Sequence, residues 1–315
     1  MPARKPILVL FFLSGATALL YQVLWSRLLT LVFGSTTFAV SAVLTAFMVG
    51  LALGAFLFGR FADRLDRPLR LYATLELGIA LAALVIPGLI DRLSAIYPAL
   101  HAASLDWPWV LPVARLLLSL LILTFPCLLM GGTLPVLVRV AARAPERFGR
   151  DFGLLYGMNT LGAVAGALAG GFWLIGQFGI SATNRLGIGI NLALALAFFL
   201  LDRRLGRLPS PPADPQVEGS RSSIPEKLVI LVAVFSGFTI LGLEVLWTRA
   251  LVQAFWSTTY SFTAVLAAVL LALASGSFLA ARFPVVAGRD LDRRLLGRLA
   301  WVELLFALSL LLALP

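Results

Sequence analysis

An internal repeat in an apolar part of the chain constrains its fold more than any other feature. Residues 14–60 reappear at 236–282 without a gap, at a constant offset of 222 positions. Shared Leu and Ala are expected from membrane composition alone, but rarer residues also keep the register: Trp25 pairs with Trp247, Arg27 with Arg249, and Ser35, Thr36 and Thr37 with Ser257, Thr258 and Thr259. A common register for such residues predicts a duplicated membrane unit.

The composition is typical of a membrane protein. Hydrophobic residues make up 60% of the chain and charged residues only 13%, which is unlike a water-soluble domain. The formal net charge of +10 could suggest a nucleic-acid partner, but the basic residues form short clusters between apolar runs instead of one basic face. We therefore attribute the charge to membrane topology and expect no nucleic acid. The single cysteine, Cys127, excludes an intrachain disulfide and a thiolate cluster.

A helix that crosses a bilayer needs about 20 mainly apolar residues, and nine runs of this kind follow one another along the chain. They lie near residues 7–26, 38–59, 71–90, 111–138, 152–178, 181–201, 228–248, 258–281 and 299–315. The sequence therefore predicts an all-α, polytopic membrane protein with about nine transmembrane helices, in contact with the lipid bilayer.

The basic residues predict the orientation of these spans. Lys and Arg precede the first span and follow the second, fourth, sixth and eighth, and short cytoplasmic loops are enriched in both residue types. The other side receives only five of the 25 basic residues: Arg27, Arg92, Arg115, Arg185 and Arg249. We expect a multi-pass protein of the cell inner (plasma) membrane with a cytoplasmic N-terminus.

Six spans separate equivalent positions, so the second copy should enter the membrane in the same orientation as the first. This is a parallel repeat, as in major-facilitator-like transporters. We expect a first six-helix repeat over 1–201, a Pro-rich cytoplasmic linker over 202–227, and an incomplete second repeat over 228–315. The second copy contains three of its six expected helices, which suggests that the chain is the front part of a longer protein or that another chain completes the bundle.

Several strings resemble a known membrane family. They are FLSGATALLYQVLWSR (12–27), FGSTTFAVSAVLTAFMVGLALGAFLFGR (33–60), LLMGGTLPVLVR (128–139), FGLLYGMNTLGAVAGALAGGFWL (152–174) and GLEVLWTRAL (242–251). Together they resemble the membrane region of the transmembrane spermidine synthase-like proteins, also described as fused major facilitator/spermidine synthase proteins. The resemblance implies a polyamine or a related small cation as a ligand.

The aminopropyltransferase activity of that family belongs to a soluble domain after the helices. Such a domain needs a strand, a Gly-rich turn and a helix to hold the cofactor, with acidic residues nearby, and none of these is found in this sequence. We therefore expect no catalytic, cofactor-binding or metal-binding residues here, and an enzyme only where a soluble domain is attached.

A second motif, GRFADR, follows the second span. It resembles the major facilitator loop signature, in which an acid and an arginine after a glycine lock neighbouring helices by charge pairing. Gly59, Asp63 and Arg64 would form this cytoplasmic latch, although the residue after the arginine is Leu65 where the signature has a glycine. A solvated, positively charged loop explains the motif equally well.

Polar residues inside the spans are the candidates for a substrate or proton site, because a charge in the bilayer costs roughly 3 kcal/mol. Glu76 and Glu303 occupy similar places in the third spans of the two copies, and Gln22 and Glu244 match in the opening spans. Glu76 could carry a proton or bind a cation, or form an interhelical hydrogen bond. Asn159 could line a cavity, but the nearby Gly157, Gly162, Gly166 and Gly170 favour close helix packing.

Aromatic and basic residues mark the outer ends of the opening spans. Trp25, Arg27, Trp247 and Arg249 are interpreted as outer-edge anchors, since arginine side chains there can extend to the membrane surface. A role as substrate ligands is the alternative for Arg27 and Arg249.

Three functions remain open. The first is the membrane domain of a spermidine synthase-like protein without its catalytic domain. The second is a truncated or split secondary transporter of the major facilitator type, and the third is a noncatalytic membrane scaffold. A downstream Gly-rich nucleotide-type motif with paired acids would favour the first, and three more apolar spans would favour the second.

Overall fold

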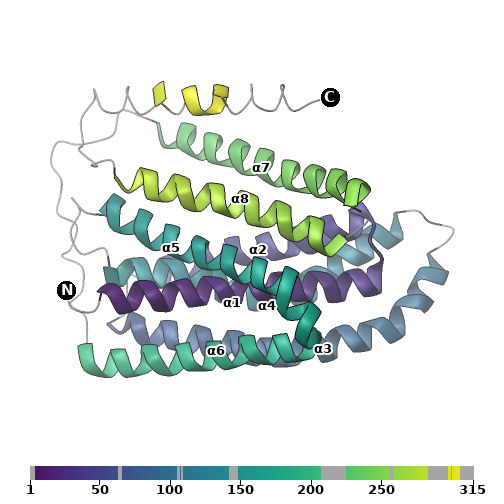
Figure 1. Ribbon diagram of the computed structural model, residues 1–315, viewed down its shortest axis with the longest axis horizontal. Coiled ribbons are helices and arrows are strands. Elements are labelled where there is room, and N and C mark those ends of the chain that lie inside the picture. Colours follow the sequence, from purple (N-terminus) through teal and green to yellow (C-terminus); the bar gives the residue numbers. More distant parts are fainter. Residues whose placement is uncertain are drawn as a thin grey trace.

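The described part of the protein is a bundle of long helices. The computed structural model describes residues 4–62, 66–104, 107, 109–141, 148–206, 225–255, 258–282, 297–298 and 300–305, and the structural statements below concern these residues. The helices are α1 (Arg4–Phe33), α2 (Thr37–Ala62), α3 (Pro68–Ala103), α4 (Val110–Ala141), α5 (Phe148–Leu168), the π-helical turn η2 (Ala169–Leu174), α6 (Ile175–Leu205), α7 (Glu226–Phe255) and α8 (Thr258–Ala280) (Figure 1).

Seven continuous helical stretches in the described residues are long and apolar enough to cross a membrane. The longest stretch, 149–205, contains a break at Gly179. The φ of Gly179 is +76°, a backbone angle that glycine adopts readily because it has no Cβ. Figure 1 shows α6 running back along the bundle after this break. The stretch therefore contains the fifth and sixth predicted spans. The ninth predicted span, apart from 300–305, lies outside the described residues.

Local sequence explains how the first hairpin forms. Gly34 adopts a φ of +82° directly after α1, which lets the chain turn sharply. Thr36 then caps the start of α2, because its Oγ1 accepts a hydrogen bond of 3.3 Å from the backbone N–H of Ala39. At the opposite end of the bundle, Pro68 opens α3 in the first helical turn, where a missing N–H costs nothing.

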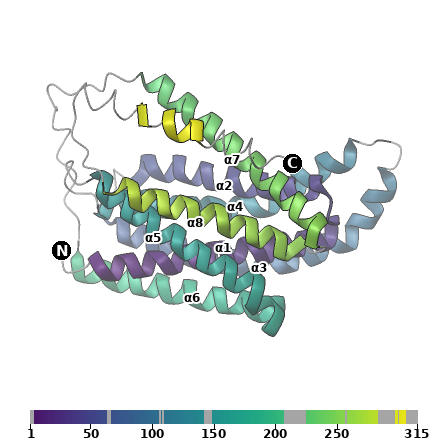
Figure 2. The ribbon, with the colours of Figure 1, turned by 45° about the horizontal axis from the view of Figure 1, so that its top comes forward.

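The helices follow the sequence repeat. α7 begins and ends 222 residues after α1, at Glu226 and Phe255. Figures 1 and 2 show α1 and α7 running in the same direction, with α2 and α8 returning antiparallel to them. The predicted all-α fold with a parallel repeat is thus confirmed, and seven continuous helical stretches of the described residues contain the first eight predicted spans.

Glycines allow close contact between the helices of the first bundle. A Cβ at Gly162 or Gly166 on α5 would overlap a backbone carbonyl of α1, at Phe12 or Ala16 respectively. On α1, a Cβ at Gly15 would overlap the carbonyl oxygen of Asn159. The predicted glycine stripe therefore does pack against another helix, and that helix is α1.

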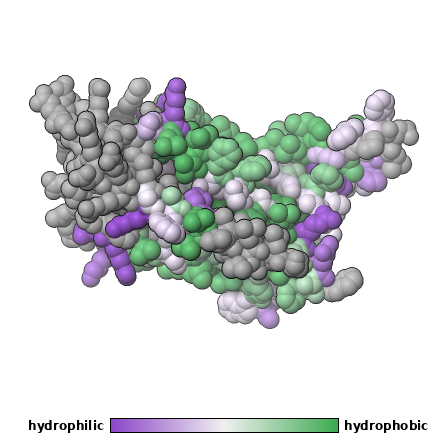
Figure 3. Space-filling model, turned by 90° about the horizontal axis from the view of Figure 1, so that it is seen from above, coloured by the Kyte–Doolittle hydropathy of each residue, from purple (hydrophilic) through white to green (hydrophobic). Residues whose placement is uncertain are grey.

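The second copy joins the first through α8, which lies along α5. Gly153 and Gly157 of α5 face Ala281 and Phe278 at the end of α8 and just beyond it. α7 contacts α8 and only the edge of α2, so most of its surface is exposed. Figure 3 shows apolar residues over the middle of one face and hydrophilic residues gathering toward its two ends, as expected for helices that cross a membrane.

Candidate functional site

A buried carboxyl group lies at the centre of the first bundle. Glu76 on α3 is fully buried, and both of its carboxyl oxygens accept hydrogen bonds from other helices. The hydroxyl of Ser14 on α1 donates to Oε1 at 2.5 Å, and Nδ2 of Asn191 on α6 donates to Oε2 at 2.5 Å. Glu76 therefore connects three helices that are distant in sequence.

The network around Glu76 continues along α1. The hydroxyl of Tyr21 donates a hydrogen bond of 2.9 Å to Oδ1 of Asn191, and the Tyr21 ring stacks on Trp25 with ring centres 5.0 Å apart. On the other side, the ring of Tyr72 packs against Phe198 at 4.0 Å. Aromatic rings thus surround a short polar chain and keep water away from it.

The donors to Glu76 are neutral. Within the described ranges, Glu76 makes no ion pair with a lysine, arginine or histidine. A buried carboxylate is costly unless it is hydrogen-bonded or paired with a charge. Protonation would weaken both bonds, because hydrogen bonds to an ionised acceptor are roughly twice as strong as bonds to a neutral one.

The second copy contains the counterpart of this contact. Ser236, which is equivalent to Ser14, donates a hydrogen bond of 2.7 Å to Oε1 of Glu303. Glu303 therefore matches Glu76 once a five-residue insertion is allowed, as the sequence predicted. Unlike Glu76, Glu303 is exposed in the described part of the chain.

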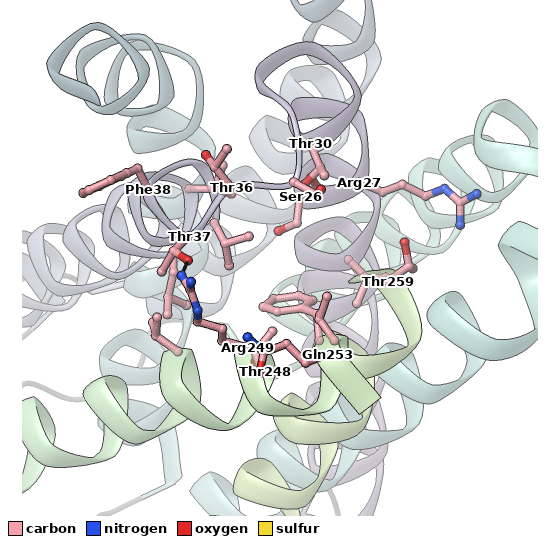
Figure 4. Close-up of a pocket in the computed structure, with 18 residues that line it drawn as sticks. Ser26, Arg27, Thr30, Thr36, Thr37, Phe38, Thr248, Arg249, Gln253 and Thr259 are labelled. Atoms are coloured by element: carbon pink, nitrogen blue, oxygen red, sulfur yellow. Dashed lines mark hydrogen bonds between the residues drawn. The ribbon is translucent and has the colours of Figure 1, made fainter. Parts of the chain in front are cut away.

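A pocket of about 610 Å³ lies between the two copies, where α1 leads into α2 and α7 leads into α8 (Figure 4). Much of its lining consists of pairs that the repeat makes equivalent. These pairs are Val23 and Val245, Ser26 and Thr248, Arg27 and Arg249, Thr30 and Val252, Thr37 and Thr259, and Val40 and Phe262. The pocket is thus built at the repeat interface by the same positions of both copies.

Arginines connect the elements around this pocket. Figure 4 shows Arg249 pointing from α7 toward Thr37, to whose hydroxyl Nη1 donates a hydrogen bond, while Arg27 extends on the opposite side, away from Arg249. Arg115 on α4 approaches from behind Thr36, with a hydrogen bond of 3.1 Å to its hydroxyl. Arg115 is buried, and its Nε also donates to the hydroxyl of Tyr97 at 2.8 Å.

Gln22 and Glu244 lie one helical turn deeper than the pocket residues Ser26 and Thr248. They are 2% and 3% exposed, respectively. Among the described residues, Nε2 of Gln22 and Oε1 of Glu244 have no hydrogen-bond partner. These matched side chains therefore place unsatisfied polar atoms below the pocket, although neither side chain lines it.

The remaining predicted residues are found elsewhere. Asn159 lies at the crossing of α5 with α1, where its carbonyl oxygen contacts Gly15, outside the pocket lining. Gly59 lies near the end of α2, but Asp63 and Arg64 lie outside the described residues, so the predicted latch stays a prediction. At the same end of the bundle, Arg67 forms an ion pair of 3.3 Å with buried Asp202.

The expected position of Trp25 needs correction. Trp25 is fully buried and stacks on Tyr21 inside the bundle, so it does not anchor α1 at a lipid surface. Its repeat equivalent, Trp247, is 42% exposed. The difference arises because α5, α6 and α3 pack on α1, whereas the described helices leave most of α7 uncovered.

Several residues of these sites are not among the site residues predicted from the sequence. Asn191 and Tyr21 complete the Glu76 network, and Arg115 supports the pocket. Asn191 was detectable as an amide inside an apolar run, the criterion that selected Asn159. Tyr21 carried no comparable signal. No three His, Cys, Asp or Glu side chains of the described residues come together as metal ligands, and the expectation of no metal or cofactor stays a prediction.

Comparison with known proteins gives a family and one similar fold. Residues 7–315 match the Major Facilitator Superfamily. The in meso crystal structure of the POT family transporter PepTSo is similar with a TM-score of 0.42 and 14% sequence identity, over 90% of this chain and 55% of that one. The chain thus spans about half the length of that transporter. No curated protein matches significantly.

Proposed function

The chain belongs to the major facilitator superfamily, and on this premise we propose that it acts in secondary transport. The solute occupies the pocket between the two repeat copies, and Glu76 is the group that takes up and releases a proton. The observation that carries the proposal is the pocket lining, in which equivalent residues of both copies face one cavity. Substrate sites of transporters built from repeats form at such an interface.

The role of Glu76 is argued from its burial. A carboxyl group inside a membrane bundle is expensive, and it is retained where it serves transport or a proton relay. Ser14 and Asn191 satisfy both of its oxygens with neutral donors. Neutral donors of this kind stabilise the carboxyl group of Glu76. They do not hold it in the ionised form as strongly as a paired arginine would.

α1 provides the physical link between the two sites. Ser14 and Tyr21 reach the Glu76 network from one face of α1, and Val23, Ser26 and Arg27 line the pocket from another. Protonation of Glu76 adds an O–H donor and weakens its oxygens as acceptors of the bonds from Ser14 and Asn191. The position of α1 is thereby coupled to the shape of the pocket.

Uptake into vesicles tests the proposal. The protein is reconstituted in liposomes, and solute uptake is measured with and without an imposed pH gradient. We expect the gradient to drive accumulation in the wild type and Glu76→Gln to abolish accumulation while preserving solute exchange. Gradient-driven accumulation by Glu76→Gln at the wild-type rate would show that Glu76 is structural.

A second candidate is the membrane region of a spermidine synthase-like protein, favoured by the sequence strings quoted above. It would anchor a soluble aminopropyltransferase domain and supply it with a polyamine. Transfer of an aminopropyl group from decarboxylated S-adenosylmethionine to putrescine by this chain alone would contradict the anchor role. A noncatalytic scaffold would show neither transfer nor uptake.

The topology and domain division remain proposals as well. We propose an inner-membrane protein with a cytoplasmic N-terminus, supported by the basic residues around 60–70 and 203–207. The division at 201 and 228 and the completion of the bundle by further helices or another chain also stay predictions. Labelling of cysteines introduced at Arg70 and Arg204 from one side of the membrane, and at Arg92 from the other, tests the orientation.

A further inference from the structure

We propose that the pocket between the copies binds a small soluble organic anion, held through a carboxylate or phosphate group, and not a polyamine. This proposal rests on the proposed function and names the class of its solute. The cationic ligand implied by the family resemblance is the opposite expectation.

The charged residues of the lining are all basic. Arg27 and Arg249 line the pocket, and no aspartate or glutamate is among the lining residues that the structure describes. The volume of about 610 Å³ fits a metabolite-sized ligand. A polyamine in this pocket would meet arginines and no carboxylate of the described lining, whereas an anion would find Arg249 beside Thr37, with Arg27 on the opposite side.

Arg249 still has donors to offer a ligand. A guanidinium carries five N–H donors, and the hydrogen bond to Thr37 uses one of them. An anion beside Thr37 would therefore accept from Arg249 in the fork geometry that suits carboxylates and phosphates. Arg115, bonded to Thr36 behind the lining, adds a third positive charge near the pocket.

Two helix N-termini reach the same pocket. α2, of 26 residues, begins at Thr37, and α8, of 23 residues, begins at Thr258. The first turns of both helices contribute lining residues, at Thr37 and Thr259. Each N-terminus carries a partial positive charge, which favours an anion.

A buried hydroxyl group points to the same ligand chemistry. Thr248 lines the pocket, is only 5% exposed, and has no hydrogen-bond partner for Oγ1 among the described residues. A buried hydroxyl without a partner is costly, and a ligand oxygen would satisfy it. Glu244 lies one turn below Thr248 and outside the lining. Even if Glu244 is ionised, its single negative charge is smaller than the two positive charges of Arg27 and Arg249.

Thermal unfolding of the purified protein in detergent tests the proposal. The midpoint is measured at constant ionic strength against rising concentrations of succinate, inorganic phosphate or putrescine. We expect succinate or phosphate to raise the midpoint by several degrees in a saturable way, and putrescine to leave it unchanged. A saturable rise with putrescine, or none with either anion, would overturn the anion assignment.

Variants separate the pocket from general charge effects. Arg249→Gln and Arg27→Gln should each weaken the apparent affinity for the anion about tenfold or more, while Arg185→Gln, exposed on α6 and outside the pocket, should keep it. Should a glutamine variant fail to fold, the lysine variant should bind with intermediate affinity. Unchanged affinity in both pocket variants would overturn the site.

Two further arms identify the source of the anion. If phosphatidylglycerol raises the thermal midpoint and neither soluble anion does, the pocket binds a lipid headgroup. That result would overturn the proposal that its ligand is a soluble anion. Binding in detergent does not require transport, so the two proposals can fail separately. Anion binding without uptake into vesicles would contradict only the proposed transport function. Uptake of putrescine would contradict only the proposal that the ligand is an anion.

Discussion

Ser14 on α1 donates a hydrogen bond of 2.5 Å to the buried carboxyl group of Glu76 on α3. The same kind of bond recurs in the second copy, where Ser236 on α7, 222 residues after Ser14, donates to Glu303 at 2.7 Å. Duplication has therefore retained a polar contact between the first and third helices of each copy. The surroundings differ, because Glu76 is fully buried and Glu303 is exposed in the described part. This pair of contacts allows a matched comparison.

Ser14→Ala should destabilise the protein more than Ser236→Ala. The first change leaves a buried carboxyl oxygen without a donor, at a cost of about 1–3 kcal/mol. The second breaks an exposed hydrogen bond, worth about 0.6 kcal/mol on average between membrane helices. Equilibrium unfolding in sodium dodecyl sulfate measures both values. An equal loss of unfolding free energy in the two variants would mean that the burial of Glu76 does not determine how much its hydrogen bond contributes.

Tyr21→Phe should weaken proton coupling with little loss of stability. The change removes the hydrogen bond to Asn191 and keeps the stacking on Trp25, so we expect a cost of about 1 kcal/mol. Without this bond Asn191 holds Glu76 less rigidly, and pH-driven uptake should fall several-fold. Tyr260→Phe, at an exposed tyrosine of α8, is the control. Identical uptake in both variants would contradict the role of the Tyr21 bond.

Gly162→Ala should separate α1 from α5. A Cβ at this position would overlap the carbonyl oxygen of Phe12, and backbone cannot move aside as a flexible side chain can. We expect a loss of about 1–3 kcal/mol in unfolding free energy. Gly189→Ala on α6 is the control, since a Cβ there meets no atom within 4 Å. It should be neutral or slightly stabilising because alanine favours helix.

Arg67→Ala should destabilise the connection between α3 and α6. Asp202 is 2% exposed and forms its ion pair with Arg67, so removal of the arginine leaves a buried carboxylate unpaired. Because Arg67 itself is 40% exposed, we expect about 1–3 kcal/mol, below the cost for a wholly buried pair. Arg204→Ala, exposed on α6, should stay within about 0.5 kcal/mol. The same detergent unfolding assay compares the two variants.

Glu244→Gln should raise the thermal midpoint. Glu244 is buried, and its Oε1 has no partner among the described residues. The substitution introduces the residue type that the first copy carries at Gln22, and it removes a buried ionisable group. A lower midpoint would show that the carboxyl group makes a stabilising contact. Retained succinate or phosphate binding is expected, because Glu244 does not line the pocket.

Interactions between distant helices were the least predictable part of the site. The polar residues of the apolar runs were identified as candidates, and the match of Glu303 with Glu76 follows from the repeat. Asn191, however, lies 115 residues from Glu76 in sequence, and a sequence pattern gives no information on which helices will be neighbours. The predicted position of Trp25 at the membrane edge is wrong for the same reason, since α5, α6 and α3 pack on its helix.

The sequence by itself determined the membrane class, the helical spans and the parallel repeat. These depend on the length and polarity of each segment and on a constant offset, which the equivalent bounds of α1 and α7 reproduce. Only the tertiary structure decided that Ser14 and Asn191 bond Glu76, and that Arg27 and Arg249 line one pocket. Whether a segment crosses the membrane depends on the hydrophobicity of that segment alone. Hydrogen-bond partners and cavities depend on how residues far apart in sequence pack together.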